Sequence, residues 1–252
     1  MKITFLGTGT SIGVPEMGCT CAVCKSNNPK DKRLRTSVMI ETDQTCILID
    51  CGPDFREQVL RWGFRRIDGI LVTHEHYDHV GGIDDLRPFC YQGDVPIYAE
   101  QNVIEHLMQR LPYCFGPNKY PGTPRIVMKS ISPENTFSIN ELIIIPIRVM
   151  HGKLPIVGFR IGNMAYITDM KSLDDNEFDK LQGLDVLIVN ALHTKEHPTH
   201  QNVMQAVNFS QRVGAKNTYF VHMSHRVGLH DFVNTRLPES VELAYDGLAL
   251  SI

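Results

Sequence analysis

Short apolar segments rich in β-branched residues alternate with helical segments along the whole chain, and this alternation limits the possible folds most strongly. The period-two and helical spacings predict three helices, at residues 53–62, 100–111 and 201–213. They predict five strands in each half of the chain, at residues 3–6, 37–41, 46–50, 69–73 and 96–99, and then at 142–149, 156–161, 164–168, 186–190 and 218–222.

Two halves with several strands each, and helices between the strands, indicate two sheets packed together with helices on both outer faces. The predicted fold class is therefore α/β, a four-layer αββα sandwich of two similar halves. No linker rich in Pro, Gly or Ser separates the halves, so we expect one domain over residues 1–252. The loop at residues 112–124 is either a lid over a site or a packed surface loop.

Composition excludes several classes of protein. Hydrophobic residues make up 42% and charged residues 21%, which is typical of a globular chain and not of a disordered or fibrous one. The longest apolar run, residues 142–147, is far shorter than the roughly 20 residues that cross a bilayer. The first residues turn polar too early for a signal peptide, so we expect a cytoplasmic protein with no membrane partner. A net charge of −3 argues against a nucleic-acid partner.

The histidines and some of the cysteines are clustered. Seven cysteines cannot form a complete disulfide framework, and four of them lie in apolar surroundings typical of small core residues. The other three fall within six residues. The clusters comprise Cys19, Cys21 and Cys24; His74, His76 and His79; His193, His197 and His200; and His222 and His225.

The strongest chemical signal is a His-x-His-x-Asp-His motif directly after the apolar strand at residues 69–73. His74 and His76 are two residues apart, so in extended chain their side chains point the same way. Asp78 and His79 follow at a turn, where they can face the same cavity from the other side. Four metal-preferring side chains in six residues suffice for one metal ion and part of a second. A polar loop that is rich in histidine by chance is the weaker interpretation.

This motif resembles that of the metallo-β-lactamase superfamily of hydrolases. Further residues at strand ends follow in the superfamily's order, namely Asp50 in Asp-Cys-Gly, His151, Asp169 and His222. The resemblance extends along nearly the whole chain and implies the αββα fold.

The resemblance also implies a ligand set for two metal ions, either Zn or Mn. His74, His76 and His151 would bind the first ion, and Asp78, His79 and His222 the second, with Asp169 bridging both. Asp78 would be essential for catalysis, and Asp50 would orient the histidine loop without binding metal.

The Cys-x-Cys-x-x-Cys run has metal-ligand spacing and needs a fourth ligand, although redox-active or structural thiols are the alternative. Combined with the hydrolase motifs, it is similar to that of the cyclic phosphodiesterases of the phosphonate carbon–phosphorus lyase pathway. The resemblance implies a structural zinc bound by Cys19, Cys21, Cys24 and His225. The related transfer-RNA 3′-processing endonucleases share the catalytic layout and lack this cysteine cluster.

Two further residues are candidates for catalysis and substrate binding. His200 lies 22 residues before His222, a spacing that fits the relatives' histidine beside the leaving group, and an imidazole suits general acid catalysis. His197 is the rival candidate, and His193 is interpreted as structural. Arg87 follows two carboxylates, so it either binds a substrate oxygen or forms a surface ion pair.

The resulting functional hypothesis is a dinuclear metal-dependent phosphodiesterase that uses a metal-bound hydroxide. It would hydrolyse small cyclic phosphodiesters, of the phosphoribosyl cyclic phosphate or 2′,3′-cyclic nucleotide type, to phosphate monoesters. We expect a small-molecule substrate and a homodimer. One alternative is RNA 3′-end processing or another ester hydrolysis within the superfamily. The other is a non-catalytic binding or carrier protein on the same scaffold.

Overall fold

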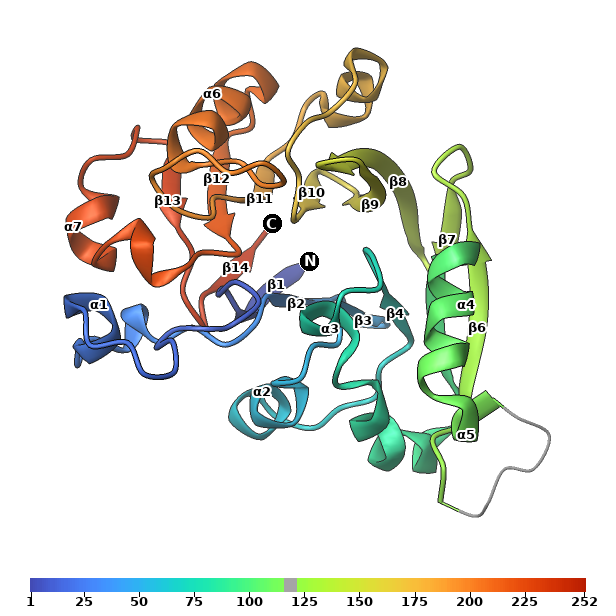
Figure 1. Ribbon diagram of the computed structural model, residues 1–252. Helices are drawn as coiled ribbons and strands as arrows, with labels where there is room; N and C mark the ends of the chain where they lie inside the picture. The colour runs from blue at the N-terminus through green and yellow to red at the C-terminus, as the bar shows by residue number, and fades with distance from the viewer. Residues whose placement is uncertain (116–121) are drawn as a thin grey trace.

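The computed structural model describes residues 1–115 and 122–252. Two seven-stranded sheets pack face to face, and helices lie on their outer faces (Figure 1). This arrangement confirms the predicted αββα sandwich.

The first sheet has the order β14-β1-β2-β3-β4-β5-β6. Strands β14 to β3 are antiparallel to their neighbours, and β3 to β6 run parallel. Its strands are β1 (Lys2–Gly7), β2 (Ser37–Glu41), β3 (Cys46–Ile49), β4 (Gly69–Leu71), β5 (Val95–Glu100), β6 (Ile126–Ile131) and β14 (Ala249–Ser251).

The second sheet repeats this scheme in the order β7-β8-β9-β10-β11-β12-β13, antiparallel from β7 to β10 and parallel from β10 to β13. The two halves are therefore similar, as the sequence predicts. Its strands are β7 (Phe137–Ile139), β8 (Leu142–His151), β9 (Leu154–Ile161), β10 (Met164–Ile167), β11 (Val186–Asn190), β12 (Asn217–Val221) and β13 (Val241–Leu243).

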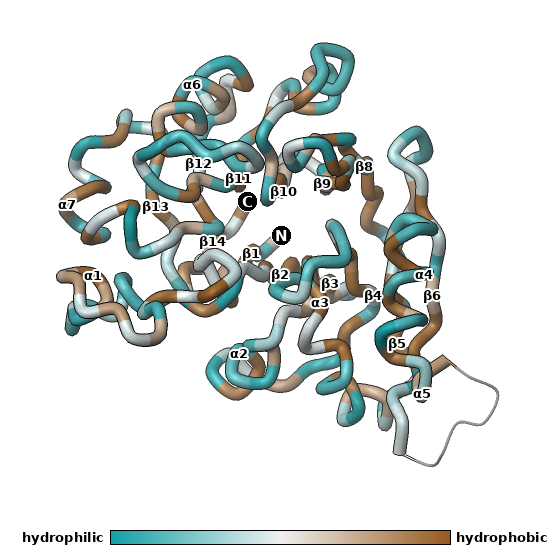
Figure 2. Tube along the Cα trace, viewed as in Figure 1, coloured by the Kyte–Doolittle hydropathy of each residue, from teal (hydrophilic) through white to brown (hydrophobic). Residues whose placement is uncertain are grey.

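Three apolar clusters hold the layers together. The central cluster joins the inner faces of both sheets, with Phe5 from the first and Phe159 and Tyr166 from the second all fully buried. Along the strands, alternate side chains face this centre and an outer helical layer, so both faces of the sheets are apolar. Many residues along the strands are accordingly hydrophobic (Figure 2).

The outer helices differ between the sheets. The first sheet is covered by α2 (Phe55–Trp62), the 3₁₀ helix η2 (Ile83–Gln92) and α4 (Gln101–Arg110), and the second by η3 (Asp175–Leu181), α6 (Val203–Val213) and α7 (His230–Asn234). The remaining short helices are α1 (Ala22–Lys25), η1 (Pro29–Asp31), α3 (Tyr77–Val80), α5 (Pro112–Phe115) and η4 (His225–Val227).

Helix α6 begins with a capping box between Asn202 and Gln205, whose side chains each accept a hydrogen bond from the other's backbone N–H. It ends at Gly214, whose left-handed φ of 69° suits glycine. The capping box fixes the chain directly after His200, so the helix start sets the position of that histidine.

Several strands end one residue earlier in the structure than the sequence predicts. The strands expected to reach Asp50 and His222 stop at Ile49 and Val221, because Asp50 and His222 have φ values of 61° and 54°. A left-handed residue cannot continue a strand. Strands β6, β7, β13 and β14 were not predicted at all.

Two further predictions concern the loop at 112–124 and membrane-spanning helices. The predicted loop at 112–124 includes residues 116–121, which lie outside the described residues, so the lid stays a prediction. Across the part of the chain that the structure describes, every helix is too short or too polar to cross a membrane.

Candidate metal centre

The metal-preferring side chains of both halves meet where several strands end. Asp50 follows β3, the His74–His79 motif follows β4, His151 ends β8, Asp169 follows β10 and His222 follows β12. Parallel neighbours end at the same edge of a sheet, so β3 with β4, and β10 with β12, deliver their loops together. Helix α3 then turns Asp78 and His79 inward, and both are buried.

One group of four ligand atoms converges on a single point. His79 Nε2 lies 3.2 Å from Asp78 Oδ2 and 3.4 Å from Asp169 Oδ1, and His222 Nε2 lies 3.2 Å from each of these oxygens. A tetrahedral ion with bonds of about 2.1 Å separates its ligand atoms by roughly 3.4 Å. The spacing therefore fits one divalent ion.

Two further groups share Asp169. His74 Nε2 lies 3.9 Å from Asp169 Oδ2 and 3.0 Å from His76 Nδ1, and His200 Nδ1 lies 3.8 Å from the same carboxylate oxygen. His151 completes the third group with Asp169 and His200. One oxygen of Asp169 thus faces His79 and His222, while the other faces His74 and His200. An anionic carboxylate placed in this way can bridge two cations.

The unpaired nitrogens also fit a metal. Among the described residues, the buried atoms His79 Nε2 and His200 Nδ1 form no hydrogen bond of good geometry, although His79 Nε2 lies beside the carboxylates of Asp78 and Asp169. A buried polar atom without a hydrogen bond is costly, and the His79 atom is a lone-pair donor of the kind that zinc and manganese take. The predicted ligands His74, His76, Asp78, His79, His151, Asp169 and His222 are thus brought together, although their roles as ligands stay predictions.

Neighbouring groups hold the ligands in orientation. Asp50 accepts hydrogen bonds from Thr73 N at 2.9 Å and from His79 Nδ1 at 2.8 Å, which leaves His79 Nε2 facing the cluster. His151 Nδ1 lies 2.8 Å from Asp169 O and 3.0 Å from Thr199 O, so it donates to backbone carbonyls and frees Nε2. Such partners fix the imidazole tautomer.

The protonation states suit cation binding. Burial alone would raise the pKa of Asp169, but His222 and His79 hold it well below its ordinary value. Burial lowers the pKa of His74 well below the ordinary value, and the nearby His79 adds to this effect. Burial opposes a charge on His79, yet Asp78 and Asp169 raise the pKa of its imidazole. A bound cation would take the place of the His79 proton.

The second histidine cluster extends outward from the centre. The His200 ring stacks on His222 at a centroid distance of 5.0 Å and lies 4.6 Å from His151. His197 lies one ring farther out, 5.1 Å from His200, and His193 lies 5.8 Å beyond His197. Burial lowers the pKa of His200 to about 3. Of the two candidate acids, the structure places His200 at the cluster.

The three clustered cysteines and His225 form a separate group. His225 Nδ1 lies 3.2 Å from Cys24 Sγ and 3.8 Å from Cys21 Sγ, where a tetrahedral zinc would separate sulfur from nitrogen by roughly 3.6 Å. The other ring nitrogen, Nε2, lies 3.3 Å from Glu16 Oε2. No motif in the sequence points to this carboxylate, which fixes the imidazole as such partners do at zinc sites.

The thiols of this group differ in their environment. The backbone N–H of Cys24 lowers the pKa of the exposed Cys21, whereas burial raises the pKa of Cys24 to about 11. Three sulfurs and one imidazole nitrogen match the donor set of a closed structural zinc site. The group therefore fits a metal ion.

A short backbone ladder joins the two groups. Met223, which follows His222, donates its N–H to Thr8 O and accepts from Thr10 N, both at 3.0 Å. Ser224 N then donates to Leu192 O at 2.9 Å, one residue before His225. The segment that carries both His222 and His225 is thus held by the loop that leads to the cysteines.

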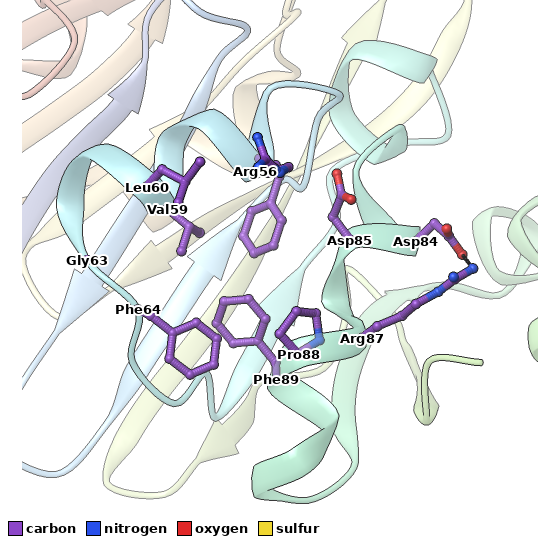
Figure 3. Close-up of a pocket in the computed structure, with 11 residues that line it drawn as sticks. Arg56, Val59, Leu60, Gly63, Phe64, Asp84, Asp85, Arg87, Pro88 and Phe89 are labelled. Carbon is purple, nitrogen blue, oxygen red and sulfur yellow. Dashed lines mark hydrogen bonds and ion pairs between the residues drawn. The ribbon is translucent and has the colours of Figure 1, made fainter. Parts of the chain in front are cut away.

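Arg87 lies elsewhere. It is on η2, where it donates to Asp84 at 2.8 Å, and Tyr113 also donates to Asp84 at 2.6 Å. Figure 3 shows the groove between α2 and η2, about 510 Å³ in volume, which Arg87 lines together with Phe64 and Phe89. The ion pair of Arg87 agrees with the surface interpretation, and its role in substrate binding stays a prediction.

Comparisons with known proteins identify the fold family. Residues 45–223 match the family model described as a beta-lactamase superfamily domain. The chain belongs to the metallo-β-lactamase superfamily. The matched residues contain every member of the His/Asp cluster and exclude the cysteine group, which lies on both sides of the superfamily region.

Two solved structures and one curated protein are similar to this chain over nearly all of its length. A "new diphosphatase from the PhnP family" is 40% identical, with a TM-score of 0.93, over 100% of this chain and 97% of that one. Zn²⁺-bound PqqB from Methylobacterium extorquens is 18% identical, with a TM-score of 0.81 and full coverage of both chains, and so shows the fold alone. An octanoyltransferase of Porphyromonas gingivalis is 46% identical over 98% of this chain and 51% of its own length.

The chain spans about half the length, or less, of the curated relatives it matches. The octanoyltransferase name therefore belongs to a protein with about as much chain again outside the segment that aligns with this chain.

Proposed function

We propose that the chain is a dinuclear metal-dependent phosphodiesterase that hydrolyses small substrates, including cyclic phosphodiesters. The observation that carries the proposal is the buried Asp169 carboxylate, which faces two groups of histidines with its two oxygens. The similarity to a diphosphatase of the PhnP family supports it, because that protein also acts on phosphoryl groups.

Bound divalent ions would supply an activated water nucleophile and would neutralise charge on the phosphoryl oxygens. The protein's own residues prepare the centre for this chemistry. Asp78 and Asp169 are held as carboxylates by the surrounding histidines, and Asp50 fixes the ring of His79. Because the ligands other than the exposed His76 are buried, and several are held by hydrogen bonds, the centre is preorganised around a charged substrate.

His200 is placed to protonate the leaving oxygen. Its Nδ1 atom is buried, has no hydrogen-bond partner among residues 1–115 and 122–252, and lies 3.8 Å from Asp169 Oδ2. Since burial lowers its pKa to about 3, the ring is neutral at pH 7 before substrate binds. The negative charge of a bound phosphoryl group would raise that pKa and so favour the protonated ring.

A substrate panel tests the function. The protein, loaded with Zn²⁺ or Mn²⁺, is assayed on bis-p-nitrophenyl phosphate, 2′,3′-cyclic nucleotides, a diphosphate ester and an RNA with a 3′ trailer. We expect hydrolysis of the small phosphodiesters, and loss of that hydrolysis in Asp78→Ala with a lower metal content. A folded, fully metal-loaded Asp78→Ala that stays active would contradict the dinuclear centre. Activity on the RNA alone would support the endonuclease alternative, and metal binding without hydrolysis the carrier alternative.

A further inference from the structure

Strand β11 lies between β10 and β12, whose ends deliver Asp169 and His222 to the metal centre. The last residue of β11 is Asn190, a fully buried polar side chain. Its Oδ1 accepts a hydrogen bond from Met170 N at 2.8 Å, and its Nδ2 donates to Met170 O at 3.0 Å. A buried amide that is satisfied at both ends holds its partner rigidly. Asn190 therefore clamps the residue that directly follows Asp169, and we call this contact the β11 clamp.

The peptide group between Asp169 and Met170 is held from both sides. Its carbonyl oxygen, Asp169 O, accepts from His151 Nδ1 at 2.8 Å, and its N–H, on Met170, donates to Asn190 Oδ1. Asp169 has a φ of 55°, a conformation that persists only where the surrounding contacts impose it. The Asn190 amide therefore sets the plane of this peptide group, and through that plane the backbone of Asp169 and the ring of His151.

The β11 clamp also reaches His200. Met170 O accepts a second hydrogen bond, from Gln201 N at 3.0 Å, so one carbonyl is shared by Asn190 and by the residue after His200. Gln201 O in turn accepts from Leu192 N at 3.0 Å, two residues after Asn190. The end of β11 and the residues that follow it thus hold the segment that carries His200 at two points.

The other side of the centre has supports of its own. Thr168 Oγ1 donates at 2.8 Å to Asp169 Oδ1, which is the carboxylate oxygen that lies near His79. The ring of His79 is itself held by Asp50 at 2.8 Å. These two contacts do not pass through the β11 clamp. Loss of Asn190 should therefore disturb one side of Asp169 and leave the other side in place.

We propose that Asn190 is a positioning residue for one half of the dinuclear centre. It holds Asp169 Oδ2, the His151 ring and His200 in register, whereas Asp50 orients the half that contains His79. This inference rests on the proposed phosphodiesterase function, because it places the proton donor of that reaction in the half that Asn190 holds. One buried amide then controls both the affinity for one metal ion and the position of the acid.

Titration with Mn²⁺ tests the metal part. Mn²⁺ suits the oxygen and imidazole ligands of the centre better than thiolates, so the Cys₃His group can keep Zn²⁺. Electron paramagnetic resonance then counts the ions, because two Mn²⁺ ions that share a carboxylate are spin-coupled. We expect wild type to bind two Mn²⁺ ions. Asn190→Ala should bind one with unchanged affinity and the other about 10- to 100-fold more weakly, the usual cost of losing a group that orients metal ligands.

Asn202→Ala is the matched control. Asn202 is also buried, and its side chain accepts from Gln205 N at 2.8 Å, so both substitutions shorten a buried asparagine and remove the acceptor of a backbone N–H. Asn202→Ala should lower the free energy of unfolding, as lost helix caps do, and leave both Mn²⁺ affinities within about twofold of wild type.

Asn190→Leu is made in parallel, because it removes the same two hydrogen bonds and keeps more of the side-chain volume. It should reproduce the Mn²⁺ result of Asn190→Ala. Loss of the fold in both variants, checked by circular dichroism, would show that Asn190 supports the whole sheet and would overturn the selective role.

A combination with Asp50→Asn tests whether the two residues serve different ions. The double variant Asp50→Asn/Asn190→Ala should weaken both ions, each by about the factor seen in the single variants. If one ion keeps its wild-type affinity in the double variant, or if Asn190→Ala weakens both ions equally, the division into halves is wrong.

Rates on two substrates test the part that concerns His200. The ratio of the rate on 2′,3′-cyclic nucleotides to that on bis-p-nitrophenyl phosphate should fall about 10-fold in Asn190→Ala, because a displaced acid protonates an alkoxide poorly. An unchanged ratio would refute the link between Asn190 and His200. Wild type that binds two Mn²⁺ ions without hydrolysing any phosphodiester would instead refute the proposed function, and the Mn²⁺ titration would still decide whether Asn190 positions the metal ligands.

Discussion

The Asp50→Asn substitution tests how far the metal centre depends on a residue that contacts no metal. Asp50 is fully buried and accepts hydrogen bonds from Thr73 N, Thr73 Oγ1 and His79 Nδ1. Asparagine has nearly the same shape and tolerates the φ of 61°, so the backbone should be preserved. The single side-chain oxygen of asparagine cannot accept hydrogen bonds from both Thr73 and His79, because the amide NH₂ group would then face the N–H or O–H donors of one of them.

The expected loss of metal affinity follows from the contact between Asp50 and His79. Loss of a carboxylate behind a ligating histidine typically costs 10- to 100-fold in metal affinity or activity, about 1.4 to 2.7 kcal/mol. We expect Asp50→Asn to weaken metal binding by that factor in a competition titration with a chromophoric chelator, and to lower kcat/KM accordingly.

Asp246→Asn is the control for that experiment. Asp246 is a partly buried carboxylate that accepts from Thr8 Oγ1 at 2.8 Å and Leu34 N at 2.7 Å, and neither partner belongs to the His/Asp cluster. It should lose stability without losing metal affinity. If Asp50→Asn binds metal and turns over substrate within about twofold of wild type, the positioning role assigned to Asp50 is refuted.

Three further predictions concern other groups. His200→Ala should slow substrates with an alkoxide leaving group by roughly 10²- to 10⁴-fold and p-nitrophenyl esters much less, and equal losses in the two rate series would argue against proton donation. Cys21→Ser should reduce metal content by about one ion per chain and lower the free energy of unfolding before it lowers activity, and unchanged content in elemental analysis would exclude the zinc site. Burial, together with Arg33, lowers the pKa of His230 to about 4. Between about pH 6.5 and pH 4 the unfolded chain therefore binds a proton at His230 that the native state does not bind, so the free energy of unfolding falls as the pH falls. His230→Gln should therefore lose less stability than wild type between pH 7 and pH 4.5 in urea unfolding, and parallel pH profiles would contradict this.

The sequence predicted the composition of the candidate centre better than its geometry. The His74–His79 motif stands out because its members are adjacent in the chain, and Asp169 and His222 could be placed because they follow apolar strands. Their backbone conformations could not be predicted. Asp50, Asp169 and His222 all have positive φ, which costs energy for a residue with a side chain and is sustained only by the surrounding packing.

The contacts that depend on long-range packing also lay beyond the sequence. Glu16 precedes Cys19 by three residues, but its partner His225 is more than 200 residues away. Arg33 is buried and donates hydrogen bonds to Thr8, Ala244 and His230, and no local pattern distinguishes such an arginine from one on the surface. The short strands β13 and β14 carry too few residues to show a clear period.

The pairing of β14 with β1 has a consequence for how the chain folds. Lys2 lies opposite Ser251, and the amino group of Met1 donates to Ile252 O at 2.7 Å. Strand β1 is therefore synthesised long before β14, the strand that covers its edge. Contacts of such high sequence separation slow folding. During synthesis, the exposed edge of β1 is a site where nascent chains could pair with one another, so we expect the yield of folded protein to depend on translation rate and on chaperones more than its final stability would indicate.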